Sequence, residues 1–224
     1  MGFPASDDFH RSLGALLDEL EVGPDDDPLP ALRVCRQPVF LKTHALPDRI
    51  HRMPRRKDEE PGIQCPPEEW EDSPAFYMVR DGRDAIVSFA HYLREVRVRP
   101  RLQEMSFEEV IATLVRRDMP YGGWSGNVGA WRRRPGPTAI VRFEELIEDP
   151  VKAISAAASA LGVELSEPRR EPPSFEELRD RSRTPKLLRR GQAGSWRTEF
   201  PPDLLDEFWR RHGEEMHVLG YPRH

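Results

Sequence analysis

Arginine, serine and backbone N–H groups come together in this chain where a folded protein could hold an anion. Arg80 directly follows the apolar run 75–79, and Ser88 lies further along, in the first turn of an expected helix. A guanidinium group is a planar, permanently charged fork that suits phosphate. The N-terminal end of a helix adds free N–H groups and a positive dipole. These residues predict an anion site, but an arginine paired with Asp81 or Asp84 at an ordinary strand–helix junction would give the same pattern.

A second group of the same kind lies near the C-terminal end. Arg189 and Arg190 precede Gly191, and Gly194 and Trp196 follow shortly after. Glycine lets the backbone approach an anion closely, and arginine side chains can hold it. A basic surface loop would have a similar composition. The segment by itself therefore leaves both interpretations open.

Lys42 and His44 are the residues best suited to proton transfer and charge stabilisation. They stand at the end of the short apolar run 38–41, two residues apart, so that on an extended chain they lie on the same side. Histidine can take a proton from a hydroxyl near neutral pH, and lysine can stabilise charge on a transferred group. A surface lysine beside a hydrogen-bonded histidine is the alternative. The histidines lack the spacing of a metal site, and no metal is expected.

Short apolar runs and turn residues predict the elements that position these side chains. Residues 75–79 and 138–143 have the length and composition of buried strands. Gly82 fits the turn after the first of them, and Asp84 fits the N-cap of a helix that follows. Identical Ser-Phe-Glu-Glu sequences predict two further helices that begin with a capping box, after Ser106 and Ser174. Another helix is expected to start at Asp149-Pro150 and to close at Gly162.

The composition suits one compact domain over residues 1–224, with a long loop of mixed charge at 49–72. The chain has 224 residues, of which 38% are hydrophobic. A net charge of −5 disfavours nucleic acid as a partner. No apolar run approaches the length of a membrane span and no signal peptide is visible, so we expect no membrane contact. Two cysteines are too few for a disulfide framework, which favours a reduced, cytoplasmic protein.

Several segments resemble the sulfotransferase family, and they occur in the family's order. The stretch 75–88 resembles its 3′-phosphate-binding segment, and 41–47 resembles its catalytic Lys-Thr-His-Leu-Pro segment. Residues 143–150 are similar to its Tyr-Glu-Asp-Leu…Glu-Asp-Pro segment. Residues 189–196 closely resemble its Arg-Lys-Gly…Gly-x-Trp segment, which closes over the donor. The resemblance runs from about residue 38 to residue 221.

This resemblance implies an enzyme that moves a sulfuryl group from 3′-phosphoadenosine 5′-phosphosulfate (PAPS) to a hydroxyl or amine of a small-molecule acceptor. The product nucleotide would be PAP, adenosine 3′,5′-bisphosphate. The implied fold is an α/β, three-layer sandwich with a mostly parallel central sheet, the P-loop-NTPase-like fold of sulfotransferases. The resemblance makes His44 the general base and Lys42 its electrostatic partner. The donor-binding residues that it implies are Arg80, Ser88, Phe143, Arg189, Arg190 and Gly191.

The N-terminal segment departs from the family's pattern. Residues 3–10 stand in the place of its phosphosulfate loop, roughly Tyr-Pro-Lys-Ser-Gly-Thr-Thr-Trp, and Ser6 keeps the serine. Ala5 replaces the lysine, and Asp7 and Asp8 replace the glycine and a threonine. Two carboxylates would repel the phosphosulfate group. The strand that precedes this loop in the family is missing, so both an altered start and a defective donor site fit the sequence.

Two other functions fit parts of the sequence. A protein with this fold could bind the 3′-phosphoadenosine nucleotide without transfer, as the unusual N-terminal loop suggests. A P-loop kinase acting on a small molecule is the second, but the chain lacks a Gly-x-x-x-x-Gly-Lys-Ser/Thr loop. The central prediction is that Arg80 and Arg189, far apart in sequence, lie together around one phosphate. The acceptor and the oligomeric state carry no signal in the sequence.

Overall fold

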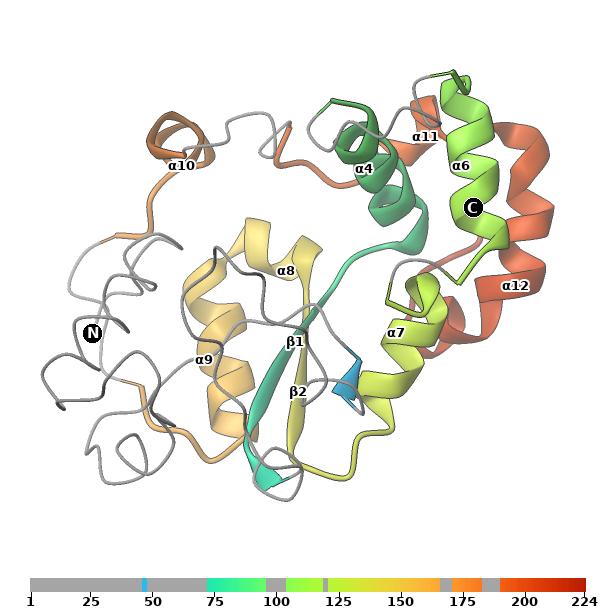
Figure 1. Cartoon of the computed structure of the whole chain (residues 1–224). Helices are drawn as coiled ribbons and strands as arrows, with labels where there is room; N and C mark the ends of the chain where they lie inside the picture. The colour runs from blue at the N-terminus through green and yellow to red at the C-terminus, as the bar shows by residue number, and fades with distance from the viewer. Residues whose placement is uncertain (1–45, 48–71, 96–103, 119–120, 166–170, 183–189) are drawn as a thin grey trace, which may run out of the picture.

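Two parallel strands lie between helices in this computed structural model, which describes residues 46–47, 72–95, 104–118, 121–165, 171–182 and 190–224 (Figure 1). Strand β1 (Ala75–Val79) pairs with β2 (Thr138–Arg142) so that their last residues lie opposite each other. The apolar run 38–41 and nearly all of the loop predicted at 49–72 lie outside the described residues.

Helices cover both faces of these strands. On one face, α9 (Pro150–Ala160) packs Ala157 against Ala139 and other alternate residues of β2. Residues of opposite parity point to the other face. There α7 (Gly123–Arg132) stacks its Trp131 ring on Tyr77, with the ring centroids 5.5 Å apart. The helix–sheet–helix order and the parallel pairing confirm the predicted α/β fold.

The positions of α9 and α8, the two helices that follow β2, can be compared with the signals in the sequence. Asp149 caps α9 by accepting a hydrogen bond from the backbone N–H of Lys152, 2.9 Å away, and the helix ends before Gly162, as predicted. The short helix α8 (Phe143–Glu148) follows β2 without a break. The predicted strand 138–143 is therefore one residue too long, because Phe143 already belongs to the helix.

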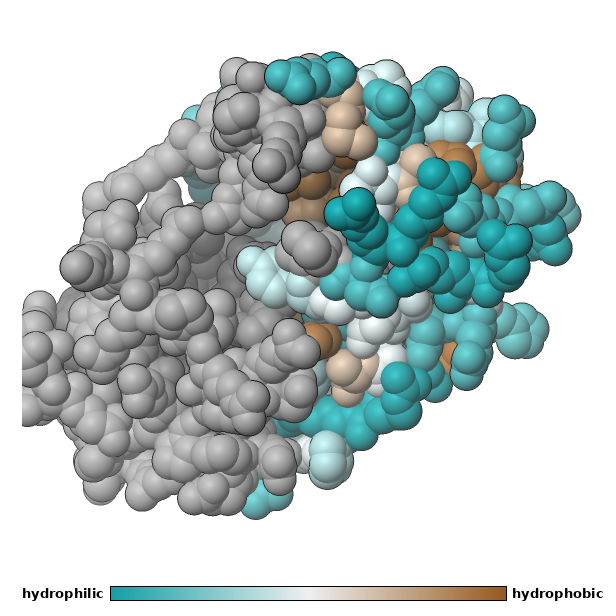
Figure 2. Space-filling model, turned by 45° about the vertical axis from the view of Figure 1, so that its right-hand side comes forward, coloured by the Kyte–Doolittle hydropathy of each residue, from teal (hydrophilic) through white to brown (hydrophobic). Residues whose placement is uncertain are grey.

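The main core lies between three long helices that gather on one side of Figure 1: α4 (Gly82–Glu95), α6 (Phe107–Arg116) and α12 (Leu205–Val218). The short elements α11 (Trp196–Glu199) and η3 (Pro202–Leu204) lead into α12. Fully buried apolar side chains from these helices include Val87, Ala90, Ile111, Val115, Phe208 and Met216. Their outer face is mainly hydrophilic (Figure 2). None of the described helices is long and apolar enough to cross a membrane.

Helix α4 begins earlier than the sequence predicted. Its N-cap is Asp81, whose Oδ1 accepts a hydrogen bond from the backbone N–H of Arg83 at 2.9 Å. The N-cap assignment of Asp84 is therefore wrong, and Ser88 lies in the second turn rather than the first. The first residue of the helix is a glycine because the Trp124 ring packs against it: a Cβ on Gly82 would lie 2.8 Å from that ring.

Candidate functional site

Arg80 lies where the ends of both strands meet a segment from near the C-terminus. It directly follows β1, and its Nη2 donates a hydrogen bond to the backbone oxygen of Gln192 at 2.7 Å. Its guanidinium also lies over the ring of Phe143, 4.6 Å from the centroid, just after β2. Open α/β sheets place their ligands at this carboxyl edge. We call residues 190–196 the closing segment; it reaches this edge and contacts Arg80.

Asp84 fixes the closing segment to α4. Its fully buried carboxylate accepts hydrogen bonds from the backbone N–H of Gly194 at 2.6 Å and of Trp196 at 2.8 Å. The Ser195 hydroxyl donates a third at 2.9 Å. A carboxylate has acceptor capacity for several donors, so one side chain satisfies two backbone groups and a hydroxyl. Figure 1 shows the result, with α11 lying against α4.

The alternative interpretation of Arg80, an ion pair with a neighbouring aspartate, holds for only part of its guanidinium. Nη2 lies 3.5 Å from an Asp84 oxygen. The Nε atom, however, is buried and has no hydrogen-bond partner among the described residues. A buried donor without an acceptor is costly, and a bound anion is one way to satisfy it. Arg80 therefore retains a donor that an anion could satisfy.

Gly191 takes a conformation and a position that other residues would not tolerate. Its φ is +59°, in the left-handed region, and an added Cβ would lie 2.3 Å from the Phe175 ring. Phe175 is the first residue of α10 (Phe175–Arg181). Sequence reasoning did not select Phe175. The sequence does offer a signal for it: Phe175 is an aromatic residue at the start of a helix that has no apolar face to bury in the core.

Arg190 is linked to α4 through Glu199 of α11 and His91 of α4. Its Nη1 lies 2.9 Å from Oε1 of Glu199, whose Oε2 lies 2.7 Å from Nε2 of His91. Ser88 comes one turn after Asp84 and lies on the same side of α4, because residues four apart share a helix face. Of the predicted donor-binding residues, Arg80, Phe143, Arg190 and Gly191 thus come from three segments that contact one another, and Ser88 lies on the helix to which they attach.

The remaining predicted site residues are not among those that the structure describes. Ser6, Lys42, His44 and Arg189 lie outside the described ranges, so their assignments rest on the sequence.

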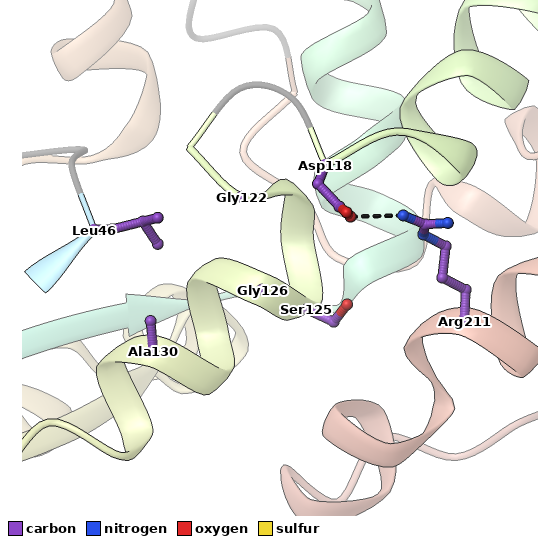
Figure 3. Close-up of a pocket in the computed structure, with 7 residues that line it drawn as sticks. All are labelled: Leu46, Asp118, Gly122, Ser125, Gly126, Ala130 and Arg211. Atoms are coloured by element: carbon purple, nitrogen blue, oxygen red, sulfur yellow. Dashed lines mark hydrogen bonds and ion pairs between the residues drawn. The ribbon is translucent and has the colours of Figure 1, made fainter. Parts of the chain in front are cut away.

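A cavity of about 560 Å³ opens beside α7 (Figure 3). Its wall on α7 consists of small side chains, and Leu46 faces them across the space. An ion pair between Asp118 and Arg211, 2.6 Å apart, forms another part of the wall. Leu46 follows the predicted base His44 by two residues in the chain. The α7 residues that line the cavity are Gly122, Ser125, Gly126 and Ala130.

The chain matches a family model described as the sulfotransferase domain over residues 70–220. Among curated proteins, it is 27% identical over 205 residues to sulfotransferase 1C2 from Oryctolagus cuniculus, which covers 81% of this chain and 64% of the relative. It is 21% identical over 172 residues to flavonol 3-sulfotransferase from Flaveria bidentis, covering 64% of this chain and 55% of that protein. The chain thus spans less than two thirds of the length of these relatives.

Two solved structures share the fold. Mouse sulfotransferase SULT7A1 complexed with PAP superposes with a TM-score of 0.53 at 21% identity, over 69% of this chain and 64% of that one. Retinol dehydratase in complex with androsterone and the inactive cofactor PAP superposes with a TM-score of 0.55 at 20% identity, over 93% of this chain and 61% of that one.

Proposed function

The chain belongs to the sulfotransferase domain family, and on that premise we propose that it transfers a sulfuryl group from PAPS to a hydroxyl or amine of a small-molecule acceptor. The product nucleotide is then PAP, the molecule present in both related solved structures. The observation that carries the proposal is the contact of Arg80 with the closing segment. Its buried Nε, which has no acceptor among the described residues, adds to it.

We assign the 3′-phosphate of the nucleotide to the edge where Arg80 meets the closing segment. A phosphate oxygen supplies an acceptor for Arg80 Nε, which has none within the part of the chain that the structure describes, and charge-assisted hydrogen bonds of this kind are strong. Gly191 lets the backbone come close to the anion. Ser88, Arg189 and Arg190 complete the proposed phosphate-binding set, in which Arg190 exchanges Glu199 for the phosphate.

Two aromatic rings flank this edge and suit the adenine base. Phe143 lies under the guanidinium of Arg80, and Phe175 lies against Gly191. Aromatic side chains stack on nucleic-acid bases with a gain of about 1–3 kcal/mol per base. Binding of the base and of the remote 3′-phosphate would then position the sulfur for reaction.

The chemical step follows from the residues that the sequence assigns. The acceptor loses its proton to His44, and its oxygen or nitrogen forms a bond to sulfur while the bond from sulfur to the phosphate oxygen breaks. Lys42 stabilises the charge on that leaving oxygen, and Ser6 belongs to the loop around the 5′-phosphate. We place the acceptor in the cavity beside α7. A cytoplasmic location, without nucleic-acid or membrane partners, is part of this proposal.

The transfer of labelled sulfuryl from PAPS to a panel of phenols, alcohols and amines tests the reaction, and calorimetric titration with PAP tests the nucleotide site. Arg80→Gln should weaken PAP binding by about tenfold or more, because a hydrogen bond to a charged group contributes about 1.5–3 kcal/mol. Arg94→Gln, in the last turn of the helix α4 that follows Arg80, is the control and should bind normally. PAP binding without turnover on any acceptor would support the binding-only alternative, and absence of PAP binding would contradict the proposal.

The acceptor site has its own test. An added Cβ at Gly126 would meet no atom within 4 Å, so a side chain can start there, and Gly126→Leu places apolar atoms at the cavity wall. We expect this variant to lose turnover with bulky acceptors while its PAP affinity stays unchanged. Unchanged turnover over the whole acceptor panel would show that the acceptor binds elsewhere.

A further inference from the structure

We propose that Asp84 is the positioning residue that assembles the 3′-phosphate site and thereby sets the preference for nucleotides that carry a 3′-phosphate. The inference rests on the proposed function and extends it to a residue for which that function gave no role. Asp84 does not itself contact the nucleotide. It acts through the closing segment and through Arg80.

The contacts of Asp84 connect the two parts of the site. Its carboxylate accepts hydrogen bonds from Gly194, Ser195 and Trp196, which lie 110, 111 and 112 residues away in the chain. The same carboxylate lies 3.5 Å from Nη2 of Arg80. Nη2 in turn donates to the backbone oxygen of Gln192. One buried carboxylate thus orients the arginine and holds the segment that faces it.

The neighbouring buried aspartate, Asp81, makes different contacts. Asp81 pairs with Arg83, two residues away, through both carboxylate oxygens at 3.0 and 2.7 Å. Arg83 also donates to the backbone oxygens of Pro222 and Arg223. Asp81 therefore stabilises the start of α4 and, through Arg83, the C-terminal end. Among the described residues, no hydrogen bond of the Asp81 carboxylate reaches the closing segment, although its partner Arg83 lies over the Trp196 ring, 3.6 Å from the centroid. Asp84 therefore holds the backbone of this segment directly, whereas Asp81 acts on it only through Arg83.

Charge and hydrogen-bond geometry explain why an aspartate is required. All three groups that face the carboxylate are donors, and an ionised carboxylate only accepts. In Asp84→Asn, one oxygen becomes an NH2 group that points at a donor, so at least one of the three hydrogen bonds is lost. Hydrogen bonds to ionised groups are also stronger than those to neutral groups. The substitution keeps the shape of the side chain and weakens its hold on the closing segment.

The test compares calorimetric dissociation constants for PAP and for adenosine 5′-monophosphate, which lacks the 3′-phosphate. In the natural chain we expect PAP to bind at least about tenfold more tightly, as one additional charge-assisted contact would give. Asp84→Asn should abolish most of this preference while adenosine 5′-monophosphate binding changes by less than about threefold. Ser195→Ala, which removes one donor and leaves the charge, should reduce the preference partially.

Glu95→Gln, an exposed carboxylate at the other end of α4, is the control and should keep the full preference. If Asp84→Asn does not fold, Ser195→Ala decides. Equal weakening of both nucleotides would show a purely structural role and overturn the inference, as would an unchanged preference in both folded variants. A natural chain without any preference for PAP would overturn the proposed function itself, and this inference with it.

Discussion

Helices α6 and α10 begin with the same four residues and reach different environments. In each, the serine before the helix accepts a hydrogen bond from the backbone N–H of the glutamate three residues later, at 3.1 Å for Ser106 and 3.2 Å for Ser174. Each glutamate side chain in turn accepts a hydrogen bond from the backbone N–H of the serine. Helix α6 then buries four apolar side chains, whereas α10 buries none.

The difference lies in the residues that follow the cap. After it, α6 has apolar residues at the spacing of one helix face, including Ile111 and Val115, which are fully buried. The corresponding part of α10 is mainly charged, and its Leu178 is 39% exposed. A capping box determines where a helix begins, while apolar periodicity determines whether it joins the core. Free of packing in the core, α10 places Phe175 against the closing segment.

The largest contrast is expected from truncating one apolar side chain in each helix. Ile111→Ala should lower the free energy of unfolding by about 2–5 kcal/mol, because it leaves a cavity in the core. Leu178→Ala in α10 should change it by less than about 0.5 kcal/mol. Urea denaturation measures both. Equal losses would mean that α10 contributes to the core as α6 does.

Helix α6 is also bound to α12 by a buried histidine, His212, and this contact should make the stability of the core depend on pH. Nε2 of His212 donates to the backbone oxygen of Val115 in α6 at 3.2 Å, and the Ser125 hydroxyl donates to Nδ1 at 2.7 Å. Burial lowers the pKa of His212 to about 4. In the unfolded chain the imidazole gains its proton near pH 6.5, so acid favours unfolding from there down to about pH 4, by roughly 3 kcal/mol.

Above pH 6.5 His212 is neutral in both states and adds no pH dependence. His212→Gln should therefore have a smaller difference in unfolding free energy between pH 7 and pH 4.5 than the natural chain has. Denaturant titrations at the two pH values measure this difference. An identical pH dependence in the variant would show that His212 does not cause the acid sensitivity.

Phe175→Ala tests the role of α10 in nucleotide binding. We expect PAP to bind more weakly by about 1–3 kcal/mol, the range for loss of one stacked base. The unfolding free energy should stay within about 0.5 kcal/mol, because α10 buries no residue. Calorimetric titration and denaturation separate the two effects. Unchanged PAP affinity would remove α10 from the site.

The smallest effects are expected at the caps themselves. Ser106→Ala should reduce global stability by about 1 kcal/mol, the typical contribution of an N-cap side chain. Ser174→Ala should leave global stability unchanged and accelerate amide hydrogen exchange in α10, because that helix can unfold locally. A global loss of the same size in both variants would contradict the comparison.

Local signals in the sequence predicted much of this fold. Both strands, the two capping boxes and the Asp149 cap depend on residues a few positions apart, and all are present in the structure. The predicted start of α4 was wrong because Asp81 and Asp84 both suit an N-cap. In the structure the cap is Asp81, which accepts hydrogen bonds from the backbone N–H groups of Arg83 and Ala85.

The site was less accessible to sequence reasoning. The partners of Asp84 lie more than a hundred residues away, and no local pattern relates them. The family resemblance selected Arg80, Phe143 and Gly191, but not the carboxylate that connects them. The roles of Ser6, Lys42, His44 and Arg189, and the single-domain organisation of residues 1–224, stay predictions.

A crystal structure of the chain with PAP tests the central claim most directly. We predict that an oxygen of the 3′-phosphate lies within about 3 Å of Arg80 Nε. Arg189 and the backbone at Gly191 should border the same phosphate, and Asp84 should keep its bonds to the closing segment. A structure in which Arg80 and Arg189 lie on opposite sides of the molecule, or in which the 3′-phosphate contacts neither, would contradict the account.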